Sequence, residues 1–505
     1  MKRSHPLRIL FLRPPYTRLK GIGQAPYFPL GIGYLTAVVN SIEGIEARLY
    51  YPENTPAGES GPIIDKKGVF DLRSAGQKRY FEALREGSHA VWSELLQVLR
   101  TFKPDVVGIS LLTPEVASAA ACIDIVKRDN PSCFIICGGV HPTFEPHGTL
   151  DIPGVDCVVM GEGETAMVQV AEAIRDGLDP AQVPGVITRH SPERHFTGCA
   201  QIDALDSIPF PARSSSFFPE RFSDVALGSI MHSRGCPWRC GFCSSRRFWQ
   251  EKVRFRKAER VVEEIEAIRS EFGIRTFTFW DDAFTIDAAI TGELCEAILA
   301  MKHPIAWRTA TRQDLLDDRM IRLMKRAGCV QLELGIETGS PRMLELIRKD
   351  IDLGETPGVI DRVNRHGIAC GVFLMAGFPD ESEEDLMNTL AFIRRIHPAE
   401  IVLNIFDPMP GSEQFERGKE LGVVPREVDF MNFRYWPDAH YAAGVSRERF
   451  NELIERMSRY VFQYNTSLPA LKRRALPELT RLIRIDRKAL FRKGIRFLSH
   501  RLFGH

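Results

Sequence analysis

The sequence predicts an α/β protein built from two successive domains and a helical C-terminal region. Short apolar strands alternate with helices over residues 7–175 and again over 225–406, and glycines follow several of the strands. This alternation is typical of parallel sheets, because each parallel crossover needs a connecting helix. The chain has 505 residues, which is enough for two or three domains. The predicted parts are residues 1–200, a linker over 201–224, residues 225–420 and residues 421–505.

Five strands are predicted in the first domain. They cover residues 7–12, 47–51, 105–110, 133–137 and 157–160. The stretch 53–75, rich in Gly, Pro and charge, predicts a loop, and the segment 77–101 predicts one helix. A doubly wound, Rossmann-like sheet binds its ligands outside the carboxyl ends of the strands. The loops 110–113, 138–143 and 161–164 are therefore expected to line one crevice.

Six strand–helix units are predicted in the second domain. The apolar run Val225–Met231 predicts a buried strand. Further strands are expected within residues 276–280, 306–310, 330–340, 371–379 and 400–406. The polar residues Asp281, Asp282, Arg312 and Glu337 stand at or near the ends of these strands. Active sites of barrels built from such units lie at the strand C-terminal ends, where these residues fall.

A loop with three cysteines follows the first strand of the second domain. Cys236, Cys240 and Cys243 have the spacing Cys-x3-Cys-x2-Cys, and Gly235 and Gly241 allow the backbone to turn. Soft sulfur ligands suit zinc or an iron–sulfur cluster. Zinc usually takes four protein ligands in two pairs, and the sequence has no second Cys-x2-Cys. Three thiolates instead leave one iron of a [4Fe–4S] cluster open to a further ligand.

This loop resembles the signature of the radical SAM superfamily. The resemblance implies that Cys236, Cys240 and Cys243 hold a [4Fe–4S] cluster whose open iron binds S-adenosylmethionine (SAM). It also implies that one electron from the cluster splits SAM into methionine and a 5′-deoxyadenosyl radical. For residues 225–420 it implies a partial (β/α)6 barrel. The alternative is that the three residues are unrelated core cysteines.

Four further residues match positions that the superfamily uses for SAM. Phe242 lies inside the cysteine loop, where the family places an aromatic ring beside adenine. Gly335 and Glu337 match a Gly-x-Glu motif at the fourth strand, whose glutamate binds the ribose or the ammonium group. Gly377 matches the turn after the fifth strand, near adenine. The resemblance implies these roles.

Charged residues near the strand ends are suited to the polar end of SAM. Asp281 and Asp282 are candidate acceptors for its ammonium group, and their alternative role is a helix N-cap or a turn. Arg312 is a candidate partner for its carboxylate, as a two-pronged donor. The alternative for Glu337 is a buried carboxylate bonded to Arg308 or Arg312. Both interpretations stay open for each residue.

The first domain resembles the cobalamin-binding domain fused ahead of many radical SAM enzymes. The matching segments are 103–110, 138–143 and 161–164. The Asp-x-His-x-x-Gly motif, which places a histidine on cobalt in other cobalamin proteins, is absent from this domain. For His141, in the segment 138–143, a loop-orienting hydrogen bond is therefore favoured over cobalt ligation. The resemblance implies cobalamin contacts for Ser110, Thr113, Gly138, Gly139, His141, Gly161, Glu162 and Gly163.

Together the two resemblances imply an enzyme that uses cobalamin and SAM to methylate an unactivated carbon. An alternative with the same cofactors is a cyclase or a rearrangement enzyme. An alternative of another class is a non-catalytic iron–sulfur redox or sensor protein, which leaves the motifs at 335–337 and 377–379 unexplained. The expected partners are a small-molecule or lipid substrate and a one-electron donor such as flavodoxin or ferredoxin. The net charge of +1 gives no general attraction to nucleic acid.

The other eight cysteines mostly lie in apolar runs and are expected to be buried thiols, not a disulfide framework. The chain starts without a signal-peptide pattern and has no apolar run of membrane-spanning length, so we expect a cytoplasmic protein. The aromatic run 430–436 predicts either a substrate pocket or, as favoured, packing against the barrel.

The C-terminal tail is basic. Residues 471–505 carry a net charge of +9, which leaves −8 for residues 1–470. Leu479, Leu482, Ile483 and Leu490 fall near one helical face, so the tail has two interpretations. It lies on an anionic membrane surface, or it is a solvated basic helix packed on the protein.

Overall fold

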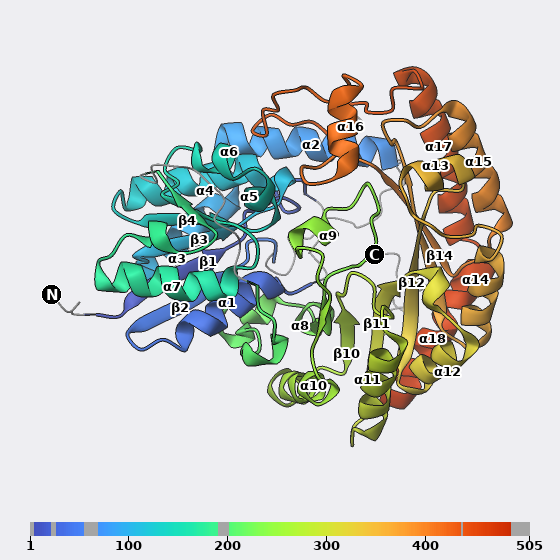
Figure 1. Ribbon diagram of the computed structural model, residues 1–505, viewed down its shortest axis with the longest axis horizontal. Helices are drawn as coiled ribbons and strands as arrows, with labels where there is room; N and C mark the ends of the chain where they lie inside the picture. The colour runs from blue at the N-terminus through green and yellow to red at the C-terminus, as the bar shows by residue number, and fades with distance from the viewer. Residues whose placement is uncertain (1–4, 22–26, 55–68, 190–200, 436–437, 486–505) are drawn as a thin grey trace, which may run out of the picture. The chain divides into compact units, whose positions relative to one another are not determined.

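The computed structural model describes residues 5–21, 27–54, 69–189, 201–435 and 438–485 (Figure 1). Two compact units result, each with its own six-stranded sheet, and the predicted α/β architecture is confirmed. The first unit comprises Met1–Leu227, Phe242–Arg254 and Asp407–Tyr441. The second unit comprises Gly228–Gly241, Phe255–Phe406 and Ala442–His505.

The sheet of the first unit has the strand order β2-β1-β3-β4-β5-β6, and only β6 is antiparallel to its neighbour. From the β1–β3 pair the chain moves outward in both directions. Because crossovers are right-handed, this places α1 and α4 on opposite faces, as in a doubly wound sheet. The strands are β1 Leu7–Leu12, β2 Ile45–Tyr50, β3 Val106–Ser110, β4 Phe134–Gly138, β5 Cys157–Val159 and β6 Val186–Thr188.

The helices of the first unit differ from the sequence prediction in one region. The helix predicted over 77–101 is two helices, and the first of them starts within the segment predicted as a loop. Gly87 interrupts them with a φ of +61°, a left-handed conformation that glycine adopts without strain. The ring of His89 then caps the second helix by accepting a hydrogen bond from the backbone N–H of Val91. The helices are α1 Leu30–Asn40, α2 Val69–Glu86, α3 Ala90–Phe102, α4 Val116–Asp129, α5 Val140–Phe144, α6 Pro146–Leu150, α7 Gly163–Asp176, α8 Asp224–Leu227, α9 Ser245–Phe248 and α16 Glu413–Glu420.

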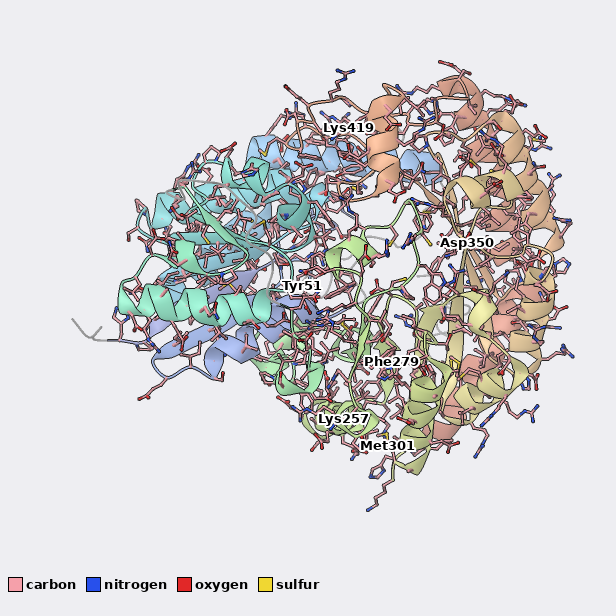
Figure 2. All side chains as sticks on the ribbon, in the orientation of Figure 1. Tyr51, Lys257, Phe279, Met301, Asp350 and Lys419 are labelled. Carbon is pink, nitrogen blue, oxygen red and sulfur yellow. The ribbon has the colours of Figure 1, made fainter. Side chains whose placement is uncertain are left out.

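The second unit contains the predicted six parallel strands, in the order β14-β13-β12-β11-β10-β7. The strands are β7 Ser229–Ile230, β10 Thr276–Phe279, β11 Ala306–Thr311, β12 Cys329–Glu337, β13 Ala369–Ala376 and β14 Glu400–Ile405. Phe279, labelled in Figure 2, is buried and packs at 5.4 Å from the ring of Trp307 on the next strand. The helices of this unit are α10 Ala258–Phe272, α11 Ala288–Ala300, α12 Asp318–Arg326, α13 Pro341–Leu346, α14 Thr356–Arg365, α15 Glu383–Arg395, α17 Arg447–Asn465 and α18 Leu468–Ile485.

The strand predicted over Val225–Met231 is wrong in extent. Its first half forms the short helix α8, and only Ser229 and Ile230 pair with β10. Beyond this pair, the carboxylate of Asp281 binds the backbone N–H groups of His232 and Ser233. The pairing with β10 does not extend to these residues.

Alternate residues along β12 divide into a polar and an apolar face. Leu332, Leu334 and Ile336 are fully buried on one face, as expected for the side that packs against helices. Gln331, Glu333 and Gly335 lie on the other face. The pairing register shifts after Gly335, and the carboxylate of Glu337 lies against this glycine at the strand end. The polar face therefore leads to the carboxyl ends of the strands.

The C-terminal segments divide between the two units. Phe433, Tyr435 and Tyr441 form a small apolar cluster with Phe415 inside the first unit, and Gln77 on α2 exchanges two hydrogen bonds with the backbone of Tyr435. These contacts differ from the expected packing against the barrel. Trp436 and the tail after residue 485 lie outside the described residues.

Helix α17 makes hydrogen bonds to β14, the edge strand of the second sheet, through the side chain of Asn465. The amide of Asn465 donates to Ile401 O and accepts from Ile401 N on β14, at 2.8 and 2.9 Å. Helix α18 contacts β12 and β13, and Arg474 pairs with Glu400 at 3.1 Å. None of the described helices combines the length and the apolar character needed to cross a bilayer.

Candidate active site

The three cysteines of the predicted cluster loop differ from the other described cysteines in their exposure. All ten described cysteines are thiols; Cys236 and Cys240 are half-buried and Cys243 is exposed, whereas the other seven are buried. Burial raises the pKa of the thiols of Cys133 and Cys137 to about 12, so they stay protonated. The predicted buried thiols are therefore present, and the accessible thiols among the described residues are the three in the loop.

The described side chains do not form a ready-made group of three His, Cys, Asp or Glu around a metal position. The fit of the loop to an iron–sulfur cluster thus depends on its donors, which are three accessible thiols within eight residues. The boundary between the two units falls inside this loop, after Gly241. The ligand assignment of Cys236, Cys240 and Cys243 stays a prediction.

Two carboxylates at the end of β10 hold the start of the cluster loop. Asp281 is buried and accepts hydrogen bonds from His232 N at 3.3 Å, from Ser233 N at 2.5 Å and from the hydroxyl of Ser233. Asp282 accepts from Gly235 N at 3.2 Å. Burial raises the pKa of Asp281 to about 6, against these hydrogen bonds. In the described structure Asp281 positions the loop, a role that neither sequence interpretation contained.

Arg312, at the end of β11, lies beside the same loop. Its Nε and Nη2 donate to the carboxylate of Asp314 at 3.0 and 3.1 Å, and Nη2 also donates to the backbone carbonyl of Asp350, labelled in Figure 2. The guanidinium lies 4.6 Å from the ring centre of Trp238. Its Nη1 is buried and has no partner among the described atoms. This remaining donor fits the predicted contact with a carboxylate.

Glu337 pairs with a residue that the sequence interpretation did not include. Lys349 donates to its carboxylate at 2.7 Å, and both side chains are almost fully buried. The alternative of a bond to Arg308 or Arg312 is therefore wrong, whereas the contact of Glu337 with SAM stays a prediction. A Cβ at Gly335 would lie 2.6 Å from Glu337 Oε1 and 3.1 Å from Lys349 Nζ, so a larger residue there would displace this ion pair.

The ion pair lies close enough to the cluster loop to act on one of its thiols. Burial raises the pKa of Cys240, while the positive charges of Lys349 and Arg312 lower it. The loop is also fastened at this point, because Gly241 N donates to Ile347 O at 2.8 Å. The structure thus brings Cys240, Arg312 and Glu337 together at the carboxyl ends of β11 and β12.

Gly377 follows β13 at the same edge of the sheet. Its φ of +101° is a conformation that favours glycine, and its N–H donates to the carboxylate of Glu381. Phe378 N binds the same carboxylate at 3.3 Å, and burial raises the pKa of Glu381 to about 8. The SAM contacts predicted for Gly377 and for Phe242 stay predictions.

The predicted cobalamin loops meet at the carboxyl edge of the first sheet. Leu111 N, next to Ser110, donates to Gly138 O at 2.9 Å. A Cβ at Gly139 would lie 3.0 Å from Leu111 O and 3.1 Å from the Ser110 hydroxyl, and its φ is +105°. The backbones of the β3 and β4 loops thus approach closely only because this residue is glycine.

His141 is buried at this edge and bonds to a neighbouring loop. Its Nδ1 lies 3.1 Å from the Thr113 hydroxyl, and the ring packs edge-on against Phe430 at 4.8 Å. Burial lowers its pKa to about 4, so the ring is neutral near pH 7. This geometry agrees with the loop-orienting interpretation of His141.

Glu162 is engaged in a buried ion pair inside the first unit. Arg254 donates to its carboxylate at 2.5 Å, Ile202 N does so at 3.2 Å, and Arg254 also donates to Ile202 O at 2.7 Å. Gly161 N donates to the Thr143 hydroxyl at 2.9 Å, and Gly163 begins α7. No sequence pattern indicated that Arg254 would pair with Glu162. Cobalamin contacts of Glu162 stay a prediction.

The carboxyl group of Glu333, on β12, is buried and only partly hydrogen-bonded. Gln331 donates to Glu333 Oε1, while Oε2 is buried without a partner among the described atoms. Burial and the negative charge of Glu400 raise the pKa of Glu333 to about 7, and Arg308 opposes this rise. The carboxyl is therefore partly protonated at neutral pH.

We expect Glu333→Gln to reduce the pH dependence of stability. Between the unfolded pKa, near 4.3, and about 7 the folded protein binds the extra proton, so stability falls as pH rises through this window. The wild-type protein is expected to lose about 1 kcal/mol more than the variant between pH 6 and pH 8. Urea unfolding at both pH values measures the difference, with the exposed Glu345→Gln as control. Equal pH dependence of wild type and Glu333→Gln would contradict the prediction.

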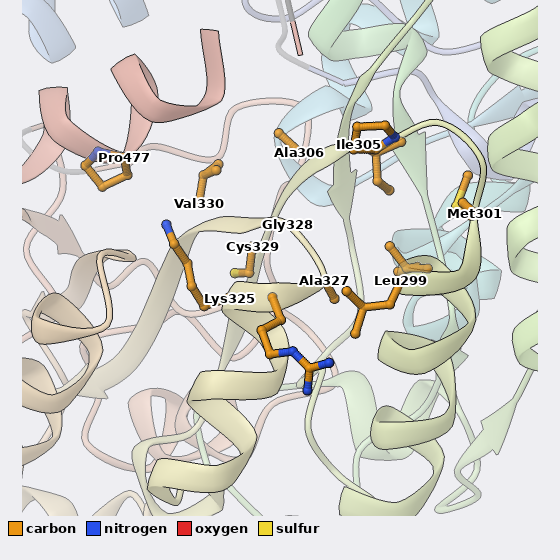
Figure 3. A pocket seen from close by; sticks show the side chains of 13 residues that line it. Leu299, Met301, Ile305, Ala306, Lys325, Ala327, Gly328, Cys329, Val330 and Pro477 are labelled. Carbon is orange, nitrogen blue, oxygen red and sulfur yellow. The ribbon is translucent and has the colours of Figure 1, made fainter. Parts of the chain in front are cut away.

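A cavity of about 110 Å³ opens at the opposite end of the second sheet (Figure 3). It is lined by the starts of β11 and β12, among them Ala306 and Cys329, and by Pro477 of α18. Barrels of this kind bind their substrates at the carboxyl ends of the strands. The cavity is therefore not the candidate active site.

Comparison with known proteins identifies both domains. Residues 230–393 match the radical SAM superfamily, and residues 76–171 match the B12 binding domain. An uncharacterized methyltransferase of Pyrococcus horikoshii is 31% identical over 370 residues, which cover 71% of this chain and 79% of that protein. The hopanoid C-3 methylase of Methylococcus capsulatus is 31% identical over 419 residues, which cover 78% and 77%.

Two further proteins bear on the reaction and the fold. The anaerobic magnesium-protoporphyrin IX monomethyl ester cyclase of Rubrivivax gelatinosus is 27% identical over 381 residues, which cover 73% of this chain and 67% of the cyclase. The structure of the radical SAM methyltransferase TsrM from Kitasatospora setae matches with a TM-score of 0.66 at 16% identity, covering 90% of this chain and 88% of that one. The latter likeness concerns the fold alone.

The two family matches confirm the predicted cofactors, which are a [4Fe–4S] cluster, SAM and cobalamin. The radical SAM match covers the cysteine loop and the ends of β10 to β13, and the B12 match covers the β3, β4 and β5 loops. The chain is therefore a cobalamin-dependent radical SAM enzyme, and it belongs to the radical SAM superfamily, among the members that carry a B12 binding domain ahead of the radical SAM domain.

Proposed function

We propose that this enzyme transfers a methyl group to an unactivated carbon of its substrate. The observation that carries the proposal is that two relatives at 31% identity, aligned over most of this chain, are named as a methyltransferase and a methylase. The bound cofactors supply the one-electron cleavage of SAM and a carrier for the methyl group. Two cofactor domains in one chain suit a reaction that divides radical formation from methyl transfer.

Residues at the ends of β10 to β13 would bind and orient SAM. Cys236, Cys240 and Cys243 would hold the cluster by their thiolates. Arg312 would direct its Nη1–H to the carboxylate of SAM, since its other donors are held by Asp314 and by Asp350 O. Asp281 would keep the loop in place through Ser233. No side chain has to act as a general base in this scheme.

We further propose a cytoplasmic one-electron donor such as flavodoxin or ferredoxin as partner. The substrate is a small molecule or a lipid, and no nucleic acid takes part. Support for the last point comes from the near-neutral net charge of +1.

The product profile tests methyl transfer. Anaerobically reconstituted enzyme with SAM, cobalamin, a reductant and an extract of a deletion strain should form S-adenosylhomocysteine and 5′-deoxyadenosine together. SAM with a deuterated methyl group should transfer its label to one metabolite of the extract. Formation of 5′-deoxyadenosine without S-adenosylhomocysteine and without a labelled metabolite would contradict the proposal.

Ring closure is the second candidate reaction, and the cyclase relative at 27% identity favours it. The same experiment separates the two candidates by mass. Methylation adds one carbon and two hydrogens to the substrate, whereas cyclisation adds no methyl group.

A further inference from the structure

Helix α18 presents an apolar stripe to the outside of the second unit. Leu468, Leu471 and Leu479 are 73%, 44% and 46% exposed. With the exposed Ala475 they follow the spacing i, i+3, i+7 and i+11, so they fall on one side of the helix. A helix that packs on a protein usually shows the reverse pattern, with its apolar side turned inward.

The opposite side of α18 is the one that packs against the protein. Ala470 is fully buried, and Pro477 lines the cavity at the starts of β11 and β12 (Figure 3). Arg474 lies on this side as well, where it pairs with Glu400 at 3.1 Å and donates to Asn465 O. The orientation of the helix is therefore fixed by contacts, and the leucine stripe is left outside.

Large exposed apolar side chains concentrate in this part of the described chain. Eleven large apolar residues are exposed among the described residues, and five of them fall between residues 462 and 479. They are Phe462, Leu468, Leu471, Leu476 and Leu479. Single exposed apolar residues are normal on a protein surface, whereas a contiguous patch marks an interaction site.

The charge of the segment indicates what covers the stripe. Residues 462–485 contain five Lys or Arg and a single acidic residue, and residues 471–505 carry a net charge of +9. Lys472 is exposed directly beside Leu471 and Leu468 on the helix. Leucines flanked by basic side chains are typical of helices that lie in the headgroup region of an anionic membrane.

We propose that α18 binds the surface of an anionic phospholipid bilayer, with its leucine stripe inserted between the headgroups and its basic residues at the phosphates. A second copy of this chain fits the surface less well, because a symmetric contact would bring two basic segments together. The helix lies on the bilayer and does not cross it. The proposal is independent of which reaction the enzyme catalyses.

Vesicle flotation of the full-length holoenzyme tests the proposal. The wild-type protein should float with vesicles in which one third of the phosphatidylcholine is replaced by phosphatidylglycerol, and should stay behind with pure phosphatidylcholine. The double variant Leu471→Glu, Leu479→Glu should bind the anionic vesicles at least about tenfold more weakly, since it places charge in the inserted stripe. High salt should weaken wild-type binding.

Leu178→Glu is the matched control, because Leu178 is 65% exposed but lies in the first unit. It should float like the wild type. The substituted positions are exposed, so both variants should keep the wild-type melting temperature, and circular dichroism checks this. The proposal would be overturned if the wild-type protein did not float with anionic vesicles, or if the double variant floated like the wild type. A wild-type dimer that the double variant converts to monomers in light scattering, without flotation of either, would also overturn it in favour of a second copy.

Discussion

Replacing Cys240 with alanine is expected to reduce the formation of 5′-deoxyadenosine from SAM to the level of a protein-free control. Each of the three loop cysteines would supply one thiolate to the cluster, and two thiolates are too few to keep it in place. Cys236→Ala and Cys243→Ala should therefore have the same effect. The measurement is 5′-deoxyadenosine under reducing, anaerobic conditions, together with the iron and sulfide content of the reconstituted protein.

Cys122→Ala is the matched control for these variants. Cys122 is a buried thiol on α4, far along the chain from the loop, and burial keeps its pKa well above the usual range. This variant should keep iron, sulfide and SAM cleavage. Wild-type iron content and wild-type cleavage in any of the three loop variants would show that the cysteine in question is not a ligand.

Replacing Asp281 with alanine is expected to lower the free energy of unfolding by about 3 kcal/mol, since three buried hydrogen bonds are lost at about 1 kcal/mol each. His232 N, Ser233 N and the Ser233 hydroxyl would then be left without an acceptor. Because these groups fix the start of the cluster loop, the iron content should fall as well, although no ligand has been changed. Urea unfolding and iron analysis measure the two effects.

Two variants separate the positioning role of Asp281 from a general loss of stability. Asp282→Ala removes the hydrogen bond from Gly235 N and should cost about 1 kcal/mol for that bond. Asp281→Asn keeps one acceptor oxygen and should fall between the two. If Asp281→Ala lost stability but kept full iron content, Asp281 would support the fold without positioning the loop.

Local sequence patterns predicted those features of the site whose residues are close together in the sequence. The spacing of Cys236, Cys240 and Cys243 depends on eight residues of one loop, so its chemistry could be predicted without a fold. Gly138 and Gly161 could likewise be assigned to strand ends, because parallel strands share their carboxyl edge.

Contacts between distant residues could not be predicted in this way. Asp281 and Ser233 are 48 residues apart, and Glu162 and Arg254 are 92 residues apart. No periodicity connects such pairs, because only the packing of several strands brings them together. The same reason explains why Lys349 was missed as the partner of Glu337, for which the sequence offered only Arg308 or Arg312 as an alternative to SAM.

The sequence by itself predicted the class of fold and, through its resemblance to known families, the cofactors, because alternation and motif spacing are local properties of the chain. The assignment of the three loop cysteines as sulfur donors stays a prediction. Only the tertiary structure decided which carboxylates hold the cluster loop and which N–H donor of Arg312 has no partner among the described atoms. It also decided the orientation of α18. Helical periodicity gathers the leucines on one side, but the contacts of Ala470, Arg474 and Pro477 turn that side outward.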